Sequence, residues 1–154
     1  MPRSRTASLL VGRNSALALR YLLVAVGLFV ATIGLWGVLW GVTTAELTLT
    51  WPLRDFRVLV AIFAGVSVGS ATVHAYTNRG LFVSWALGSA VPLGLYVVPT
   101  ASGSMPPDET VLWGIGSGLL FGIPLGTLGF LLGVVLHRAV LFRNARQKRT
   151  DARS

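Results

Sequence analysis

The chain has 154 residues, of which 53% are hydrophobic and only 12% charged, and its mean hydropathy is +0.71. Soluble domains carry roughly twice this share of charged residues, so the composition favours a membrane protein. The net charge is +8, and the absence of cysteine excludes disulfides, thiolate metal sites, cysteine nucleophiles and thioether-linked haem.

Four stretches with few charges are each long enough to cross a hydrocarbon core of about 30 Å as a helix. Helices satisfy their backbone hydrogen bonds internally, whereas open sheets and loops cannot do so in lipid. We therefore expect an all-α membrane protein, with four transmembrane helices in an antiparallel bundle that has glycine-rich packing faces. The expected single domain covers residues 1–154, with spans at about 21–42, 58–76, 81–98 and 111–136, a basic N-terminal segment 1–20 and a C-terminal tail 137–154.

The first apolar stretch runs from Tyr21 to Val42, after a basic segment. A cleavable signal peptide has an apolar region of about 7 to 15 residues, so this longer run favours an uncleaved signal anchor. At about 100° per residue, the glycines of the stretch fall within one arc of the helix, which predicts a small packing face. These glycines are Gly27, Gly34, Gly37 and Gly41.

Residues 43–57 are expected to form an outer loop. Tryptophan gathers at membrane–water interfaces, and three tryptophans near this loop predict such an aromatic belt. They are Trp36, Trp40 and Trp51.

The second apolar stretch carries small residues on one face and polar residues on the opposite face. The small face predicts helix packing, and for this face and that of the first stretch we expect packing within the chain in preference to self-association. The polar stripe could line a hydrated crevice in which a histidine exchanges protons, or its serines could bond to carbonyls of their own helix while the histidine reaches water. The small face consists of Ala61, Gly65 and Gly69, and the polar stripe of Ser67, Ser70 and His74.

The inner turn "TNRG" at residues 77–80 is so short that the second and third helices must be antiparallel neighbours. Asn78 and Gly80 are the residues expected to adopt the left-handed backbone conformation. Ser84 and Gly88 place a small face on the third helix.

A second outer loop is expected at residues 99–110. Asp108 and Glu109 lie just before the fourth helix, where negative charge stabilises a helix start or forms a cation-attracting mouth. Pro92 and Pro124 are expected to interrupt the third and fourth helices as kinks.

The fourth apolar stretch is rich in glycine, which costs roughly 0.5 to 1 kcal/mol relative to alanine within a helix. Phosphate binding does not explain these glycines, because neither GxGxxG nor GxxxxGK[ST] occurs there. On a helix they share one face, and glycine lets two helices in a bilayer approach closely. We predict a helix-packing seam of Gly114, Gly118, Gly122, Gly126, Gly129 and Gly133, with only Gly116 away from it.

After the fourth stretch, Ala139 to Phe142 extend the helix into the headgroup region, and the basic residues beyond them are expected to be disordered.

Positive charge sets the expected orientation. Lysine and arginine accumulate on the cytoplasmic side of membrane proteins, so the chain is expected in the cell membrane with both termini cytoplasmic. The basic residues of that side are Arg3, Arg5, Arg13, Arg20, Arg79, Arg138, Arg143, Arg146, Lys148, Arg149 and Arg153. The outer side has Arg54 and Arg57, together with Glu46, Asp55, Asp108 and Glu109.

No catalytic constellation is evident. His74 and His137 are too few for a structural zinc site, and Ser70 beside His74 has no acid to orient the histidine. We expect no enzyme and no cofactor. The expected partners are the lipid bilayer, anionic lipid headgroups, and another membrane protein or a second copy of the chain; the positive charge is assigned to topology and headgroups, not to nucleic acid.

The preferred hypothesis is a structural or accessory subunit of a membrane complex. The alternative is a small transporter or channel component that uses the polar stripe.

Overall fold

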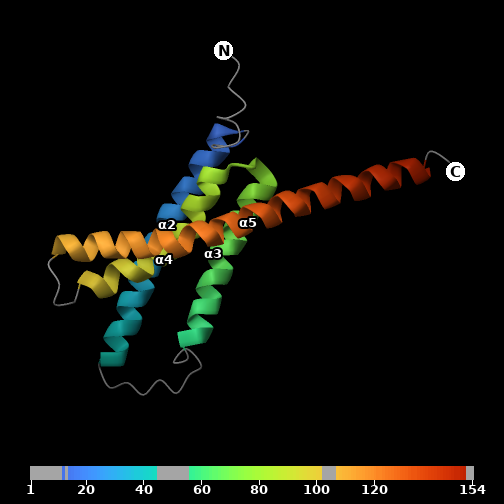
Figure 1. Ribbon diagram of the computed structural model, residues 1–154. Helices are drawn as coiled ribbons and strands as arrows, with labels where there is room; N and C mark the ends of the chain where they lie inside the picture. The colour runs from blue at the N-terminus through green and yellow to red at the C-terminus, as the bar shows by residue number, and fades with distance from the viewer. Residues whose placement is uncertain (1–11, 13, 45–55, 102–106, 152–154) are drawn as a thin grey trace, which may run out of the picture.

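The computed structural model describes residues 12, 14–44, 56–101 and 107–151, and these form four helices (Figure 1). Helix α2 covers Ser15–Thr44, α3 Phe56–Asn78, α4 Leu81–Ala101 and α5 Pro107–Asp151. The predicted all-helical class is therefore confirmed for the described chain. Several residues used for the predicted loops and orientation lie outside it: Arg3, Arg5, Arg13, Glu46, Trp51, Arg54, Asp55 and Arg153, as does the side chain of Trp40.

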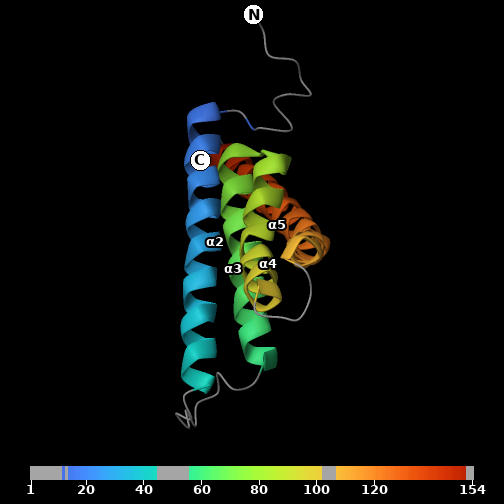
Figure 2. The same ribbon diagram turned by 90° about the vertical axis from the view of Figure 1, so that its left-hand side faces the viewer.

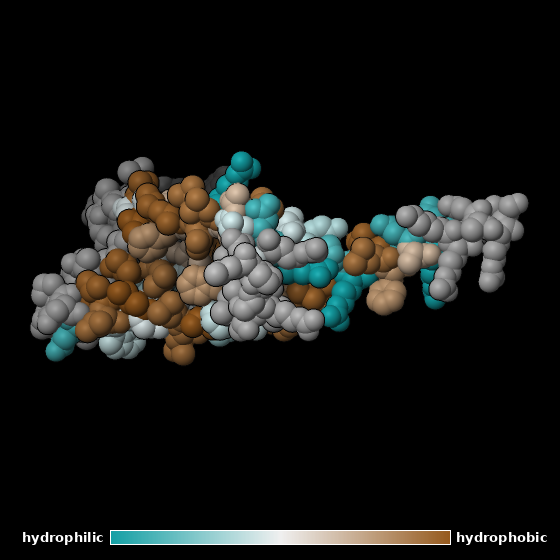
Figure 3. Space-filling model, turned by 90° about the horizontal axis from the view of Figure 1, so that it is seen from above, coloured by the Kyte–Doolittle hydropathy of each residue, from teal (hydrophilic) through white to brown (hydrophobic). Residues whose placement is uncertain are grey.

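Three helices are long and apolar enough to cross a membrane. The candidate spans are Ser15–Val38, Arg57–Asn78 and Val111–Gln147, whereas the apolar part of α4, Leu81–Val97, is shorter. Large apolar side chains are exposed along these helices; Leu112, for example, is 71% exposed and Leu120 is 70% exposed. Figure 3 shows hydrophobic residues over the packed end of the molecule and hydrophilic ones toward the projecting end of α5.

Helices α2, α3 and α4 are roughly aligned, but α5 crosses α3 obliquely (Figures 1 and 2). α4 is the central element, since it packs extensively against α5 and also against α2 and α3. α2 and α3 barely touch each other. The four helices therefore do not form the simple antiparallel bundle predicted from the sequence, because α5 follows α4 at first and then crosses α3.

Helix α5 is longer than predicted. It has 45 residues, about 67 Å at 1.5 Å per residue, so it continues through the expected boundary at residue 136 to Asp151. From Arg138 to Gln147 every residue is exposed, and this part projects beyond the other helices (Figure 1). Pro92 and Pro124, where kinks are predicted, lie within α4 and α5, and both helices continue beyond them. Proline removes one backbone hydrogen bond, and here this loss does not end either helix.

The turn between α3 and α4 consists of Arg79 and Gly80, and Arg79 adopts the left-handed conformation, with φ at 55°. The prediction that Asn78 and Gly80 adopt the left-handed conformation is wrong. Asn78 remains helical because its side chain is bound elsewhere, and the Gly80 carbonyl accepts hydrogen bonds from the backbone and hydroxyl of Ser84.

The buried glycines of α5 lie against two different helices. A Cβ atom on Gly118, Gly122 or Gly126 would meet Leu93, Ser89 or Ser84 of α4. The glycines that follow contact α3: a Cβ on Gly129 would lie 2.6 Å from the Ala71 Cβ, and one on Gly133 would lie 2.6 Å from the Ala75 Cβ. One glycine face therefore serves both neighbours because α5 crosses from α4 to α3. On α4, a Cβ on Gly88 would meet the backbone of Gly126.

The small faces of α2 and α3 point outward, contrary to the expectation that they pack within the chain. No atom lies within 4 Å of a Cβ built on the described glycines of these faces, and Ala61 is exposed, whereas the surroundings of Gly41 lie outside the description. α2 packs mainly against α4, and α3 packs against α4 and α5, so the described part of each small face has no partner among the described residues. The glycines concerned are Gly27, Gly34, Gly37, Gly65 and Gly69.

Replacing Gly122 by alanine should destabilise the fold, whereas Gly116→Ala should not. The new methyl group at position 122 would overlap Ser89, and overpacking of this kind costs typically 1–3 kcal/mol. Gly116 has open space around it, so alanine there gains helix propensity, about 0.5 to 1 kcal/mol. The free energy of unfolding in mixed micelles measures both changes, and equal values for the two variants would contradict the close α4–α5 contact.

Candidate functional site

The polar stripe of α3 faces the interior of the protein. Ser67 and His74 are fully buried, and Ser70 is half-buried and donates a hydrogen bond to the Ser67 carbonyl at 3.1 Å. The hydroxyl of Ser67 has no hydrogen-bond partner among the described residues. The stripe thus does not line an open hydrated crevice, because α3 turns it toward its neighbours.

His74 packs against an aromatic ring of α2. The His74 and Tyr21 rings meet edge to face, with centroids 4.6 Å apart, and the Tyr21 hydroxyl lies 3.3 Å from Thr77 Oγ1. The Gly80 backbone is close to the imidazole, but neither ring nitrogen makes a hydrogen bond of ordinary geometry within the described chain. Since His74 is fully buried, its ring nitrogens are not open to solvent in this structure.

The two histidines have different aromatic partners. His137 meets the ring of Tyr76 with centroids 5.3 Å apart, whereas His74 contacts Tyr21. Among the described residues, no group of three or more histidine, aspartate or glutamate side chains could hold a metal ion.

An asparagine pair joins the start of α2 to the end of α3. The Asn14 side chain accepts hydrogen bonds from the backbone of Ala16 and Leu17, which caps α2. Asn78 is fully buried; its Oδ1 accepts a hydrogen bond from the Asn14 N–H at 2.8 Å, and its Nδ2 donates to the Asn14 carbonyl at 3.1 Å. This junction escaped the sequence analysis, although an asparagine directly before an apolar helix is a capping signal.

Gly12 completes this asparagine junction. Its φ is +96°, and a Cβ atom there would lie 2.6 Å from the Asn78 carbonyl oxygen. Only glycine accepts both the backbone conformation and the close contact without strain. The segment before α2 is therefore held against the end of α3 by backbone and side-chain contacts together.

An apolar groove lies between α2, α4 and α5, with a volume of about 450 Å³. α4 lies between the other two helices in Figure 2 and forms the floor. The lining includes Leu22 and Phe29 of α2, Trp85 and Ala86 of α4, and Leu119 and Ile123 of α5. None of the stripe residues Ser67, Ser70 and His74 belongs to it.

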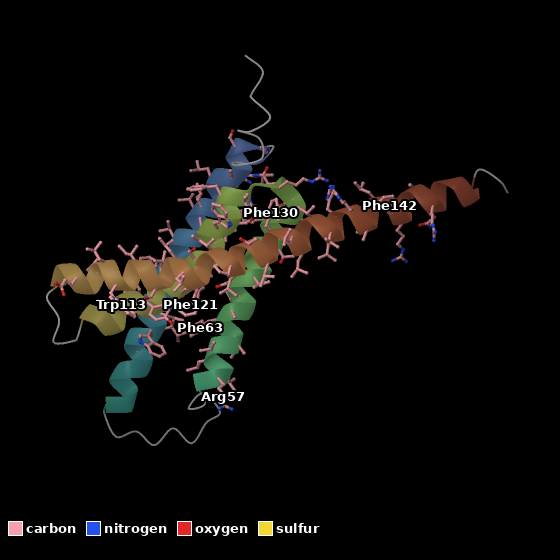
Figure 4. All side chains as sticks on the ribbon, viewed as in Figure 1. Arg57, Phe63, Trp113, Phe121, Phe130 and Phe142 are labelled. Carbon is pink, nitrogen blue, oxygen red and sulfur yellow. The ribbon has the colours of Figure 1, made fainter. Side chains whose placement is uncertain are left out.

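Polar atoms are scarce along the groove. The Trp85 indole N–H donates to the Thr127 hydroxyl at 3.0 Å, so that donor is satisfied. Ser89 also lines the groove; it is 3% exposed, and its hydroxyl has no hydrogen-bond partner within the described chain. The rings of Tyr96 on α4 and Phe121 on α5 stack with their centroids 5.7 Å apart; Phe121 is labelled in Figure 4.

Asn78→Ala should loosen the junction between α2 and α3. The substitution removes the acceptor of the Asn14 N–H and one of the two donors to the Asn14 carbonyl, which still accepts from the Ala18 N–H. Each lost hydrogen bond costs about 0.5–1.5 kcal/mol, because Asn14 is exposed and water can replace the lost partner. Trypsin cleavage after Arg20 should therefore become faster in detergent. Asn144→Ala, on the exposed part of α5, is the matched control; equal cleavage rates in the two variants would refute the role of the asparagine pair.

The described residues thus present two features of interest, a buried polar stripe and an apolar groove, and they do not share a wall. No family model matches the chain, and no curated protein or solved structure is similar to it.

Proposed function

We propose that the protein is a multi-pass integral membrane protein of the cell membrane and acts as a structural or accessory subunit of a membrane complex. In this proposal α4 crosses the bilayer together with the three longer apolar helices, since its 21 residues reach about 31 Å. The outward small faces of α2 and α3 dock another membrane protein or a second copy of the chain. The α5 glycine face holds the subunit itself together.

Exposed apolar side chains support the membrane location. Leu23 on α2, Phe82 on α4 and Leu120 on α5 are all more than half exposed, and in water such extensive apolar surface favours aggregation. In a bilayer the same side chains meet lipid tails. The projecting part of α5 carries Arg138, Arg143 and Arg146, whose charges favour anionic headgroups at about 1 kcal/mol per residue near the surface.

The observation that carries the docking proposal is the empty space around five glycines. Gly27, Gly34, Gly37, Gly65 and Gly69 meet no atom within 4 Å. Each costs roughly 0.5 to 1 kcal/mol relative to alanine in a helix, and none gains a contact within the described chain in return. A partner helix that approaches these faces closely would supply the missing contacts, as small residues do between helices in membranes.

Docking is tested with the double substitution Gly65→Leu and Gly69→Leu. Two leucines would keep a partner helix at a distance, so co-purification of the partner, or of a second tagged copy, from mild detergent should fall by at least tenfold. Helicity should not change, because Gly65 and Gly69 have no contact with other helices among the described residues. Val66→Leu, at an exposed neighbouring position, serves as the control.

If the double variant associates as well as the control does, the α3 face is not the docking surface. Recovery of the unmodified chain from the aqueous fraction of a lysate, monodisperse without detergent, would reject the membrane location itself.

The orientation is tested with single cysteines at Ser154 and Ser102. With both termini cytoplasmic, a membrane-impermeant maleimide should label position 102 from outside intact cells and position 154 only after lysis, because the basic residues keep the termini inside. The natural chain has no cysteine, so no background labelling is expected. The reverse pattern would contradict the proposed topology.

A further inference from the structure

We propose that the groove between α2, α4 and α5 binds one acyl chain of an anionic phospholipid. This inference rests on the proposed membrane location, but it concerns a binding site separate from the docking faces.

Water is a poor occupant of this groove. A buried water molecule needs two to four polar partners, and each water occupies about 30 Å³ in the liquid. The groove is large enough for several waters, so filling it with water would require several polar groups along its walls. The Ser89 hydroxyl has no hydrogen-bond partner among the described residues, but it is buried beneath the surface of the groove, and the indole of Trp85 already donates to Thr127. The other described lining residues are apolar, which favours hydrocarbon over water.

A helix is also a poor occupant. Close helix contacts in membranes use glycine and other small residues that let backbones approach, as at the α4–α5 contact. The groove has no glycine in its lining, and Phe29, Phe82 and Leu93 stand along it. These large side chains would keep a second helix away from the floor, but a flexible acyl chain only a few atoms wide can lie between them.

Charge indicates which lipid the chain belongs to. The groove begins near Leu22 of α2 and Phe82 of α4. Arg79, in the turn directly before α4, precedes Phe82 by three residues, so its charge lies close to this end of the groove. Arg20 is at a similar level of α2, but it is two residues from Leu22 and therefore on the other side of that helix. A lipid whose tail fills the groove would place its phosphate near this level, where cationic side chains favour an anionic headgroup.

The test uses Trp85 as a reporter, because its ring lines the groove. A variant that keeps only this tryptophan is titrated in non-ionic detergent with phosphatidylglycerol whose acyl chains carry bromine, which quenches tryptophan on contact. Quenching should saturate near one lipid per protein chain. A second variant that keeps only Trp113, which is 65% exposed on α5, should show gradual quenching without saturation.

Ala86→Phe in the Trp85 variant fills the groove with a ring and should abolish saturable quenching. Ala31→Phe adds the same ring at an exposed position of α2 outside the groove and should leave it intact. Native mass spectrometry of the otherwise unmodified chain, with and without Ala86→Phe, provides a second measurement that does not need the tryptophan substitutions. One bound phosphatidylglycerol should be retained, and Ala86→Phe should remove it.

Equal, unsaturated quenching of Trp85 and Trp113 would overturn the proposal, as would saturable quenching that survives Ala86→Phe. Equal affinity for brominated phosphatidylcholine would overturn the preference for an anionic lipid. If quenching of Trp85 by the brominated lipid decreases as the protein concentration rises, the groove is occupied by a second copy of the chain instead. Each of these results leaves the membrane location standing, since that location fails only if the chain is stable in the aqueous fraction.

Discussion

The arrangement of the helices depends on how closely the α5 backbone approaches α4 and α3. At Gly122 a single added carbon atom would overlap Ser89, and at Gly133 it would lie 2.5 Å from the Thr72 carbonyl oxygen. Such distances leave room only for hydrogen, so α5 can cross from one neighbour to the other in continuous contact. Because α5 is seated in this way, Leu119 and Ile123 stand beside α4 and form one wall of the apolar groove.

A second, polar constraint acts where α3 ends. Asn78 binds both backbone groups of Asn14, and the next residue, Arg79, adopts the left-handed conformation that reverses the chain. The same contacts bring Tyr21 of α2 over His74. Since α2 and α3 barely touch elsewhere, this end is where the two helices are joined directly, and it encloses the polar stripe.

Helical periodicity predicted which residues share a face, but not what each face contacts. It put Gly118, Gly122 and Gly126 on one side of α5, and that side is buried. The same rule applied to Gly27 and Gly65 predicted packing within the chain, yet both face outward. The glycine spacings of α2, α3 and α5 are similar in the sequence. Which of these faces meets another helix depends on how α5 crosses α4 and α3, and helical periodicity does not encode that crossing.

The candidate sites show the same division. The spacing of Ser67, Ser70 and His74 predicted that they share one side of the helix, but it could not predict that Ser67 and His74 are buried, or that His74 packs against Tyr21, more than 50 residues earlier in the chain. The bond between Asn14 and Asn78 joins residues 64 positions apart and has no local signature on the α3 side. The groove is lined by residues of three separate helices, so no single segment of the sequence predicts it.

The projecting end of α5 has a mechanical consequence. Gly122 is held against α4 and Gly133 against α3, whereas every residue from Arg138 to Gln147 is exposed. A small tilt of the held part is therefore enlarged with distance along the exposed arm, on which Figure 4 labels Phe142. Arg143 and Arg146 lie beyond Phe142, so these charges would move through a larger arc than the packed helices do.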